Sequence, residues 1–321
     1  MIAQNSSTRT FNLDASVIIA TRNDHRTILR AIKSALEQSL VTLEVIVVDD
    51  QSQDGIKAQI EKLSDPRVHY FLLPIHMGAA QARNFGISAA RGEWIVILDA
   101  DDAMLPTRLA KMSELANSVN ADCVIDQIVA LDEEGKCIES FMPPLPSGEV
   151  DLGFYIKGNI LFGSAGLGYL KPIIRRRFLQ KHKLQYRRDL RIGEDFALIC
   201  DMLLVGGRTF LSEGSDYIYT QRRGSVSHRC SSDDIRRMIS YDDHLSAQNP
   251  VRESERVRDV LIDHRSALRK MLIHTLLAES FSSRNFLEFF RLLFAERAAA
   301  PFLLKVIKNR FKSFAQIKGF Q

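Results

Sequence analysis

The stretch GEWIVILDADDAMLP, residues 92–106, poses the question on which the fold depends. Its apolar run, residues 94–98, has the length and composition of a buried strand. Three carboxylates follow almost at once: Asp99, Asp101 and Asp102. Ligands of open parallel sheets bind at the carboxyl ends of the strands, so we predict that this acidic cluster lines a binding crevice.

The first two-fifths of the chain alternate strand-like and helical patterns. We expect Asp54 to cap the second helix and Pro106 to occupy the first turn of the fourth. Such an alternation predicts an α/β protein with a mostly parallel sheet that helices cover on both faces. The apolar, strand-like runs lie at 16–20, 43–50, 68–73 and 94–98, and the helical patterns at about 25–38, 56–63, 79–90 and 106–117.

The rhythm changes after about residue 120. The segment DEEGK, residues 132–136, separates two apolar runs and predicts a hairpin. Residues 142–168 are rich in Pro and Gly and are expected to loop over the sheet. From about residue 233 the pattern is typical of helices, with breaks near Pro250, Ser282 and Pro301. Between these parts we expect a strand at 169–174, helices at 176–183 and 194–204, and short strands at 208–211 and 216–220.

Composition narrows the class of protein. A length of 321 residues, 45% of them hydrophobic, suffices for one large domain or two modest ones. The net charge of +4 is mild and no basic module stands out, which argues against nucleic-acid binding. Four cysteines without a CxxC pair favour a reduced, cytosolic compartment. We see no apolar leader at the N-terminus and no run of about eighteen apolar residues, so we expect neither a signal peptide nor a membrane-spanning helix.

Acidic residues recur where the strand-like runs end. The strings ATRND (20–24), DDQSQDG (49–55) and DADD (99–102) follow the first, second and fourth runs. A divalent cation together with a phosphate ligand would relieve their mutual repulsion. An Asp after a strand is also often only a turn or helix-cap residue, and this alternative stays open for Asp102. The acids concerned are Asp24, Asp49, Asp50, Asp99, Asp101 and Asp102.

The combination of strings resembles a known family. SVIIATRND, EVIVVDDQSQDG, HMGAAQARNFGISAARGEWIVILDADD and GEDF are similar, in order and spacing, to motifs of the inverting, nucleotide-sugar-dependent glycosyltransferases of family 2. The match covers about residues 14–230. Two departures are Ala20, where the family commonly has Pro, and Arg22, where an aromatic residue is common.

The resemblance implies a GT-A fold, a Rossmann-like α/β architecture with a C-terminal helical extension. We expect a catalytic domain over 1–230, with a nucleotide-sugar half at about 14–120 and an acceptor half at about 121–230. Residues 231–321 would form a helical region able to associate with a membrane.

Carried over residue by residue, the resemblance also implies roles. Thr21 and Asp50 would contact the nucleotide base and ribose, and Gly78 would permit close backbone approach. Asp99 and Asp101 would form the DxD motif and hold Mn²⁺ or Mg²⁺, with Asp101 as the principal ligand. The implied nucleotide-sugar site comprises Ala20, Thr21, Arg22, Asn23, Asp50, Gly78, Arg83, Asp99, Ala100, Asp101, Arg222 and Arg223. For Arg83, contact with the donor phosphates, bracing of an Asp and a surface ion pair are all open.

Inverting transfer needs a group that takes the proton of the attacking hydroxyl, and a carboxylate in hydrogen-bond reach does so. The string RIGEDFALICDMLL places Glu194 and Asp195 at the start of a helix, where the dipole stabilises negative charge. The first turn of a helix also attracts ordinary acidic residues. The resemblance implies that Asp195 is the base and that Glu194 stands beside it.

The segment YTQRRGSVSH, residues 219–228, is basic and follows a strand. In related enzymes a segment near here closes over the donor. Arg222, Arg223, Ser225 and His228 could therefore contact the diphosphate, the metal or the acceptor, with His228 as a further metal ligand. A lone His is more often a structural or exposed residue.

The C-terminal part carries two apolar stripes. One comprises Phe286, Phe289, Phe290 and Leu293, and the other follows Pro301 with basic residues on its opposite side. This pattern is typical of helices that lie on an anionic membrane surface. Packing on the catalytic domain or on a second subunit of a homo-oligomer is the alternative.

We therefore expect a metal-dependent inverting glycosyltransferase. It would move a hexose, with glucose from UDP-glucose as the expected donor, to a lipid-linked or oligosaccharide acceptor in bacterial exopolysaccharide assembly of the succinoglycan type. It would be a peripheral protein on the cytoplasmic face of the membrane. The alternatives are a membrane-associated scaffold on a transferase-like fold and a nucleotidyltransferase. A dehydrogenase would need GxGxxG after the first strand, where the chain has ATRNDH.

Overall fold

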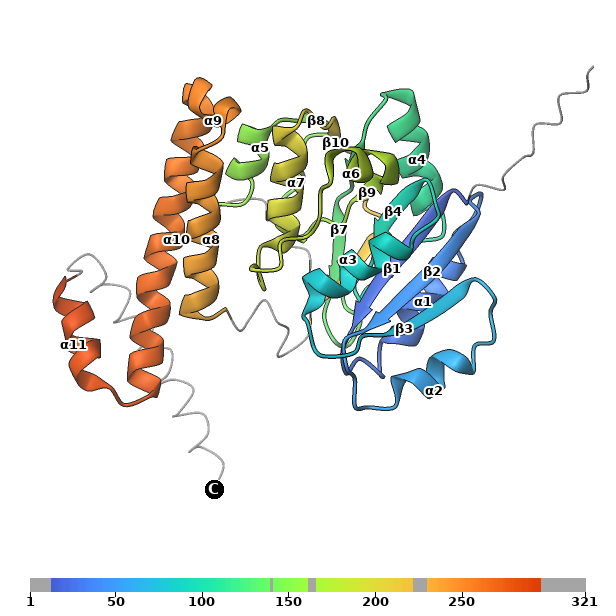
Figure 1. Ribbon diagram of the computed structural model, residues 1–321, viewed down its shortest axis with the longest axis horizontal. Coiled ribbons are helices and arrows are strands. Elements are labelled where there is room, and N and C mark those ends of the chain that lie inside the picture. The colour runs from blue at the N-terminus through green and yellow to red at the C-terminus, as the bar shows by residue number, and fades with distance from the viewer. Residues whose placement is uncertain (1–12, 139–140, 161–165, 222–229, 296–321) are drawn as a thin grey trace, which may run out of the picture.

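The computed structural model describes residues 13–138, 141–160, 166–221 and 230–295 (Figure 1). In these ranges the chain forms an eight-stranded sheet of order β3-β2-β1-β4-β9-β6-β10-β8 and a three-stranded sheet of order β5-β11-β7. Helices flank the large sheet, and a group of C-terminal helices lies at one end of the molecule (Figure 1). The predicted α/β class with a helical extension is confirmed.

The first four strands of the large sheet are parallel. Ile18 in β1 pairs with Ile46 in β2 and with Ile97 in β4, so the carboxyl ends of these strands meet at one edge of the sheet. Strands β1, β2 and β4 are almost wholly buried, which explains their continuous apolar runs. The bounds are β1 Ala15–Thr21, β2 Leu43–Asp49, β3 Val68–Leu72 and β4 Trp94–Ile97.

Helices bury alternate residues of these strands on the two faces of the sheet. Val17 and Ile19 belong to the core beneath α1, α2 and α4, whereas Ile18 belongs to the core beneath α3. The bounds are α1 Ile28–Leu36, α2 Ile56–Glu61, α3 Ala79–Ala89 and α4 Arg108–Ser118.

Two predicted helix starts are wrong. The N-cap of α2 is Gly55 rather than Asp54, because the Asp54 carboxylate accepts hydrogen bonds from the backbone N–H (2.8 Å) and the Nδ1 (3.1 Å) of His25. This contact joins the loops that follow β1 and β2. Helix α4 begins after Thr107, so Pro106 lies just outside its first turn.

The second half of the sheet is mixed. Strand β9 runs antiparallel between β4 and β6, while β10 is parallel to β6 and antiparallel to β8. The bounds are β5 Ala103–Met104, β6 Cys123–Ile125, β7 Ile128–Leu131, β8 Gly148–Val150, β9 Ile173–Arg175, β10 Thr209–Leu211 and β11 Tyr217–Thr220. The helices here are α5 Leu152–Lys157, the 3₁₀ turn η1 Leu167–Tyr169, α6 Arg176–His182 and α7 Glu194–Leu204.

The hairpin predicted around residues 132–136 is present as a short antiparallel pairing. Leu131 forms an antiparallel bridge with Cys137, the Ile138 N–H donates to the Ala130 carbonyl (2.8 Å), and the Asp132 N–H donates to the Lys136 carbonyl (2.9 Å). The apolar run before the turn does not form one long arm. It divides into β6, in the large sheet, and β7, which also pairs in parallel with β11 in the small sheet.

The C-terminal helices share the main core. Tyr241 and Leu245 of α8 and Leu261 of α10 belong to the same buried cluster as α5 and α7. The Tyr241 hydroxyl donates to the Ala197 carbonyl (2.9 Å), and the His264 ring stacks on Phe196 with 5.0 Å between centroids. The bounds are α8 Ser232–Ser246, α9 Asn249–Glu253, α10 Glu255–Ser282 and α11 Phe286–Ala295. Within the described residues, we find no helix with both the length and the apolar character needed to cross a bilayer.

Candidate active site

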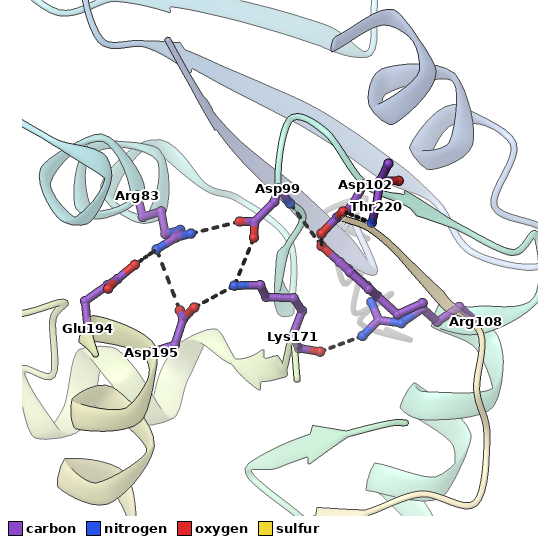
Figure 2. Close-up of polar contacts among 9 residues, drawn as sticks. Arg83, Asp99, Asp102, Arg108, Lys171, Glu194, Asp195 and Thr220 are labelled. Carbon is purple, nitrogen blue, oxygen red and sulfur yellow. Dashed lines mark hydrogen bonds and ion pairs between the residues drawn. The ribbon is translucent and has the colours of Figure 1, made fainter. Parts of the chain in front are cut away.

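Five charged side chains from four parts of the chain meet at the carboxyl-end edge of the sheet (Figure 2). Arg83 donates from Nη2 to Asp99 Oδ1 (2.8 Å) and from Nη1 to Glu194 Oε1 (2.7 Å). Lys171 Nζ donates to Asp195 Oδ2 (2.6 Å) and lies 3.0 Å from Asp99 Oδ2. Two cations thus link three carboxylates. We call these five residues the charge cluster.

The helices α3 and α7 and the strands β4 and β9 position the residues of the charge cluster. Arg83 lies on α3, and Asp99 follows β4 after one further residue. The Ile97 N–H donates to the Pro172 carbonyl (3.3 Å), which holds the start of the antiparallel β9, and with it Lys171, beside the end of β4. Glu194 and Asp195 form the first turn of α7, as predicted from the sequence.

Burial and mutual attraction set the protonation of the cluster. Burial alone would raise the pKa of Asp99 and of Asp195, but Lys171 and Arg83 outweigh it and hold both pKa values below the usual range. Burial would lower the pKa of the two cations, yet the carboxylates around them raise both. Asp99, Asp195, Arg83 and Lys171 are therefore all charged at neutral pH.

Glu194 differs from its neighbour. Burial and the negative charge of Asp195 raise the pKa of the Glu194 carboxyl, against the attraction of Arg83. Two adjacent carboxyl groups whose pKa values move in opposite directions are a recurrent arrangement in acid–base catalysis. Of the two carboxyl groups, Asp195 is the one that its surroundings hold ionised.

One oxygen of Asp195 is left without a hydrogen bond. Oδ1 is buried, has no hydrogen-bond partner among the described residues, and lies 3.7 Å from Arg83 Nη1. Burial, together with the charge of Asp195, raises the pKa of the Tyr186 hydroxyl, so this phenol stays protonated close to the cluster. An ionised carboxylate with an unused lone pair can accept a proton from an incoming hydroxyl.

A buried scaffold of ionic and aromatic contacts supports the cluster, and Figure 2 shows its link from Arg108 to Lys171. Arg108 forms a two-bond ion pair with Asp126 (2.9 and 2.7 Å) and donates to the Lys171 carbonyl (2.5 Å). Its guanidinium also lies 5.0 Å from the ring centroid of Tyr217. Arg108 is fully buried. Its hydrogen bond to the Lys171 carbonyl fixes the backbone from which the Lys171 side chain reaches the charge cluster.

Asp102 takes the structural role that the sequence left open. Its carboxylate accepts from the Tyr217 hydroxyl (2.8 Å) and from the Thr220 N–H (2.8 Å), so it fixes β11 against the DxD turn (Figure 2). Burial and the charges of Asp99 and Asp101 raise its pKa. Asp102 therefore stays within the fold and does not line a binding surface.

The residues predicted for the nucleotide lie in loops that bind one another. Buried Thr21 donates to Asp24 Oδ2 (3.2 Å), which also accepts from the Arg22 N–H (3.1 Å). Asn23, at φ +60°, exchanges hydrogen bonds with the loop after β2 through Ser52 and the Gln53 N–H. Arg22 and Asn23 are exposed and Ala20 is partly buried, so this turn borders the carboxyl-end edge of the sheet.

Asp50 organises the loop before α3. Its carboxylate accepts from His76 Nδ1 (2.7 Å) and from the backbone N–H groups of Met77 (2.6 Å) and Gly78 (2.8 Å). Gly78 has φ +87° and ψ 163°, a conformation essentially restricted to glycine. A Cβ there would touch nothing within 4 Å, so the described fold requires this glycine for its backbone angles and not for space.

The DxD turn carries the carboxylates predicted for a metal. Ala100 is buried, Asp101 is partly exposed, and the Asp101 carbonyl accepts from Arg30. Among the described residues, no three His, Cys, Asp or Glu side chains converge into a metal cage. Mg²⁺ and Mn²⁺ often take one or two carboxylates plus substrate phosphates. Because Asp99 already contacts Arg83 and Lys171, a cation here would take Asp101 and oxygens of a bound diphosphate as its main ligands.

The sequence predicts repulsion among the aspartates at the strand ends. In the structure, contacts within the protein relieve it. Asp49 accepts from the Tyr70 hydroxyl (2.6 Å) and the Ser52 N–H, and Asp99 is neutralised by the cluster's two cations. Sequence reasoning missed Lys171 altogether. The signal present was a lysine directly before Pro172 at the start of an apolar strand. The predicted contacts Arg222, Arg223 and His228 lie outside the described residues.

Comparison with known proteins gives a consistent assignment. A family model described as "Glycosyl transferase family 2" matches residues 16–167. The succinoglycan biosynthesis proteins ExoO and ExoU of Rhizobium meliloti (strain 1021) are 40% and 32% identical over 235 and 240 residues. These matches cover 72% and 71% of this chain and 67% and 68% of those proteins. The structure of residues 1–349 of S. aureus TarS in complex with UDP-GlcNAc superposes with a TM-score of 0.63 at 17% identity, over 89% of this chain and 92% of that fragment.

Proposed function

Because this chain belongs to glycosyl transferase family 2, we propose that it moves a hexose, glucose from UDP-glucose, to a lipid-linked or oligosaccharide acceptor. The names of ExoO and ExoU place those relatives in succinoglycan biosynthesis and support a role in exopolysaccharide assembly. The observation that carries the proposed chemistry is the charge cluster, with its ionised Asp195 and the unused oxygen of that carboxylate.

In this mechanism Asp195 is the base. Its Oδ1 accepts the proton of the acceptor hydroxyl while the hydroxyl oxygen attacks the anomeric carbon and the bond to the diphosphate breaks, so the configuration inverts. Binding of the acceptor must displace the side chains that bury this oxygen. Catalytic hydrogen bonds often form only in the substrate complex. Lys171 and Arg83 hold the carboxylate in place and ionised.

The nucleotide-sugar donor would lie next to the charge cluster, at the carboxyl-end edge of the parallel strands. Thr21 and Asp50, with Ala20, Arg22 and Asn23, would border the base and ribose, and the Gly78 loop would approach the donor. Asp101, with Asp99 beside it, would hold Mn²⁺ or Mg²⁺. When bound, the cation would offset the charge that grows on the leaving diphosphate. Arg83 acts in our proposal by bracing Asp99, Glu194 and Asp195.

The test is UDP release from UDP-glucose in the presence of a polyprenyl-diphosphate-linked sugar. We expect Asp195→Asn to lower the rate by at least 10²-fold, the ordinary weight of a general base. The Asp201→Asn variant is a control, since Asp201 lies further along α7 and accepts from the Tyr241 hydroxyl. An Asp195→Asn protein that folds and keeps the wild-type rate would overturn the proposal.

The proposed metal dependence has its own test. We expect UDP to raise the melting temperature of the protein more with Mn²⁺ than with EDTA, because a ligand that binds the folded state stabilises it. The Asp101→Asn variant should lose the Mn²⁺-dependent part of this shift and keep the rest. Equal shifts with Mn²⁺ and with EDTA would contradict a shared metal–diphosphate site.

We place the protein at the cytoplasmic face of the membrane. The support is an apolar surface on α11 and the end of α10, where Phe281, Phe286, Leu287 and Phe290 are 46%, 50%, 88% and 51% exposed.

A further inference from the structure

Three aromatic rings from distant parts of the chain lie beside one another. The Phe141 ring lies 5.5 Å from that of Tyr169 and 5.0 Å from that of Tyr219, and the two tyrosine rings lie 5.8 Å apart. We call these three residues the aromatic platform. The Tyr169 side chain is 40% exposed, and the other two are partly buried. The platform therefore presents ring surface to solvent.

The backbone fixes the exposed ring of the platform. Gly166 has φ +65°, and a Cβ there would come within 3.1 Å of the Tyr169 ring, so the ring packs directly on this residue. The next turn is held by Asn159, whose Oδ1 accepts from the Gly168 N–H (2.6 Å) while its Nδ2 donates to the Tyr155 carbonyl (2.7 Å). Tyr169 thus stands on a braced turn and does not sit on a free loop.

Two residues of the platform are close in sequence to side chains that reach the charge cluster. Tyr169 precedes Lys171 by two residues, and Lys171 Nζ contacts both Asp99 and Asp195. Tyr219 follows Tyr217 by two residues in β11, so the two side chains lie on one face of the strand. The Tyr217 hydroxyl bonds Asp102 and accepts from the Asp99 N–H (3.2 Å), so this face is turned toward the DxD turn.

We propose that the aromatic platform binds the acceptor sugar, a hexopyranose ring whose axial C–H groups stack on Tyr169. Saccharide rings have an apolar C–H face that suits the negative face of an aromatic ring. Binding sites for small molecules combine such rings with a few convergent polar groups, and here the charge cluster supplies those groups. The assignment as acceptor site rests on the proposed function, because it is the transfer reaction that calls for a sugar beside Asp195.

The direct test uses the full-length protein with UDP at a saturating concentration. The probes are methyl β-glucopyranoside and methyl β-galactopyranoside. Saturation-transfer NMR should show protein contact with at least one of them, strongest at the C–H groups of one ring face. Tyr169→Ala should weaken this signal at least threefold, and Tyr169→Phe should keep it. Gly166→Ala, which pushes on the ring, should weaken it without removing the aromatic group.

The matched control is Phe85→Ala, since Phe85 is 41% exposed but lies on α3, where it packs on Phe71. It should leave the probe signal unchanged. Absence of a signal for both probes with the wild-type protein, or equal losses in Tyr169→Ala and Phe85→Ala, would overturn the proposal. The result is separable from the proposed function, because UDP release from UDP-glucose is measured without these probes.

Discussion

Lys171 is the single residue whose charge most directly controls the proposed base. It contacts Asp195 and Asp99 from within the fold, and both carboxyl pKa values are depressed largely through it. A carboxyl with a depressed pKa contributes stability above its unfolded pKa and loses that contribution as the pH falls through the folded value. The same shift keeps Asp195 ionised, and so able to accept a proton, down to pH values below the ordinary aspartate pKa.

We therefore expect Lys171→Met to move the acid limb of the pH–rate profile upward by about one to two pH units, the usual effect of an adjacent opposite charge. Lys171→Arg should keep the limb near its wild-type position. The measurement is UDP release as a function of pH. An unchanged acid limb in a folded Lys171→Met protein would show that Lys171 does not set the protonation of the base.

At the same scale, the sequence revealed part of the cluster and concealed the rest. Asp99 lies in the string DADD, and Glu194 and Asp195 lie in GEDF. Because both strings are recognisable, the convergence of these residues could be predicted. Lys171 and Tyr186 could not, because their neighbours in space are fixed by β9 and by the loop before α7 and not by local spacing. Arg83 was predicted as a site residue, but its three carboxylate partners became visible only in the structure.

Among the elements, the loop between β3 and α3 is the most sharply defined by its backbone. Gly78 adopts angles open essentially to glycine alone, and its N–H binds Asp50. Gly55, at the start of α2, also has a positive φ of 78°, but with ψ 15° it lies in the left-handed helical region that other residues visit at smaller cost.

We expect Gly78→Ala to lower the free energy of unfolding by about 1–3 kcal/mol and to weaken UDP binding, because the strain falls on the Asp50 hydrogen bonds. Gly55→Ala should cost about 1–2 kcal/mol and leave UDP binding unchanged. Denaturant unfolding and calorimetric titration with UDP measure the two quantities. Unweakened UDP binding in Gly78→Ala would separate this loop from the donor site.

The predicted elements also differ in how far local pattern determined them. The strands β1, β2 and β4 and the helix α7 were placed within about a residue of their bounds, because continuous apolar runs and a glycine-preceded acidic turn are local signals. The turn of the hairpin around residues 132–136 is also a local signal. The pairing of β7 with β11, almost ninety residues further along the chain, could not be predicted, because periodicity carries no information about such a partner.

In the whole molecule, the apolar surface on α11 is the feature most open to a direct test. We expect Leu287→Asp with Phe290→Asp to reduce flotation of the full-length protein with phosphatidylglycerol-containing vesicles, since each change places a charge where an exposed apolar side chain would enter the lipid interface. Activity toward a water-soluble oligosaccharide acceptor should persist. Phe85→Asp, on a different exposed apolar side chain, is the control, and equal flotation of both variants and the wild type would remove the membrane assignment.

The shared core has a further consequence during synthesis. The apolar side of α7, the helix that begins with Glu194 and Asp195, is completed by side chains as late as Leu261 and His264. A nascent chain that has just delivered α7 from the ribosome still lacks the residues that cover this helix. The layers built on β1 to β4 can fold first, but α7 gains its last neighbours only when translation is well into α10. A chain released from a ribosome that stalls before that point has an incompletely covered α7, a form suited to capture by chaperones.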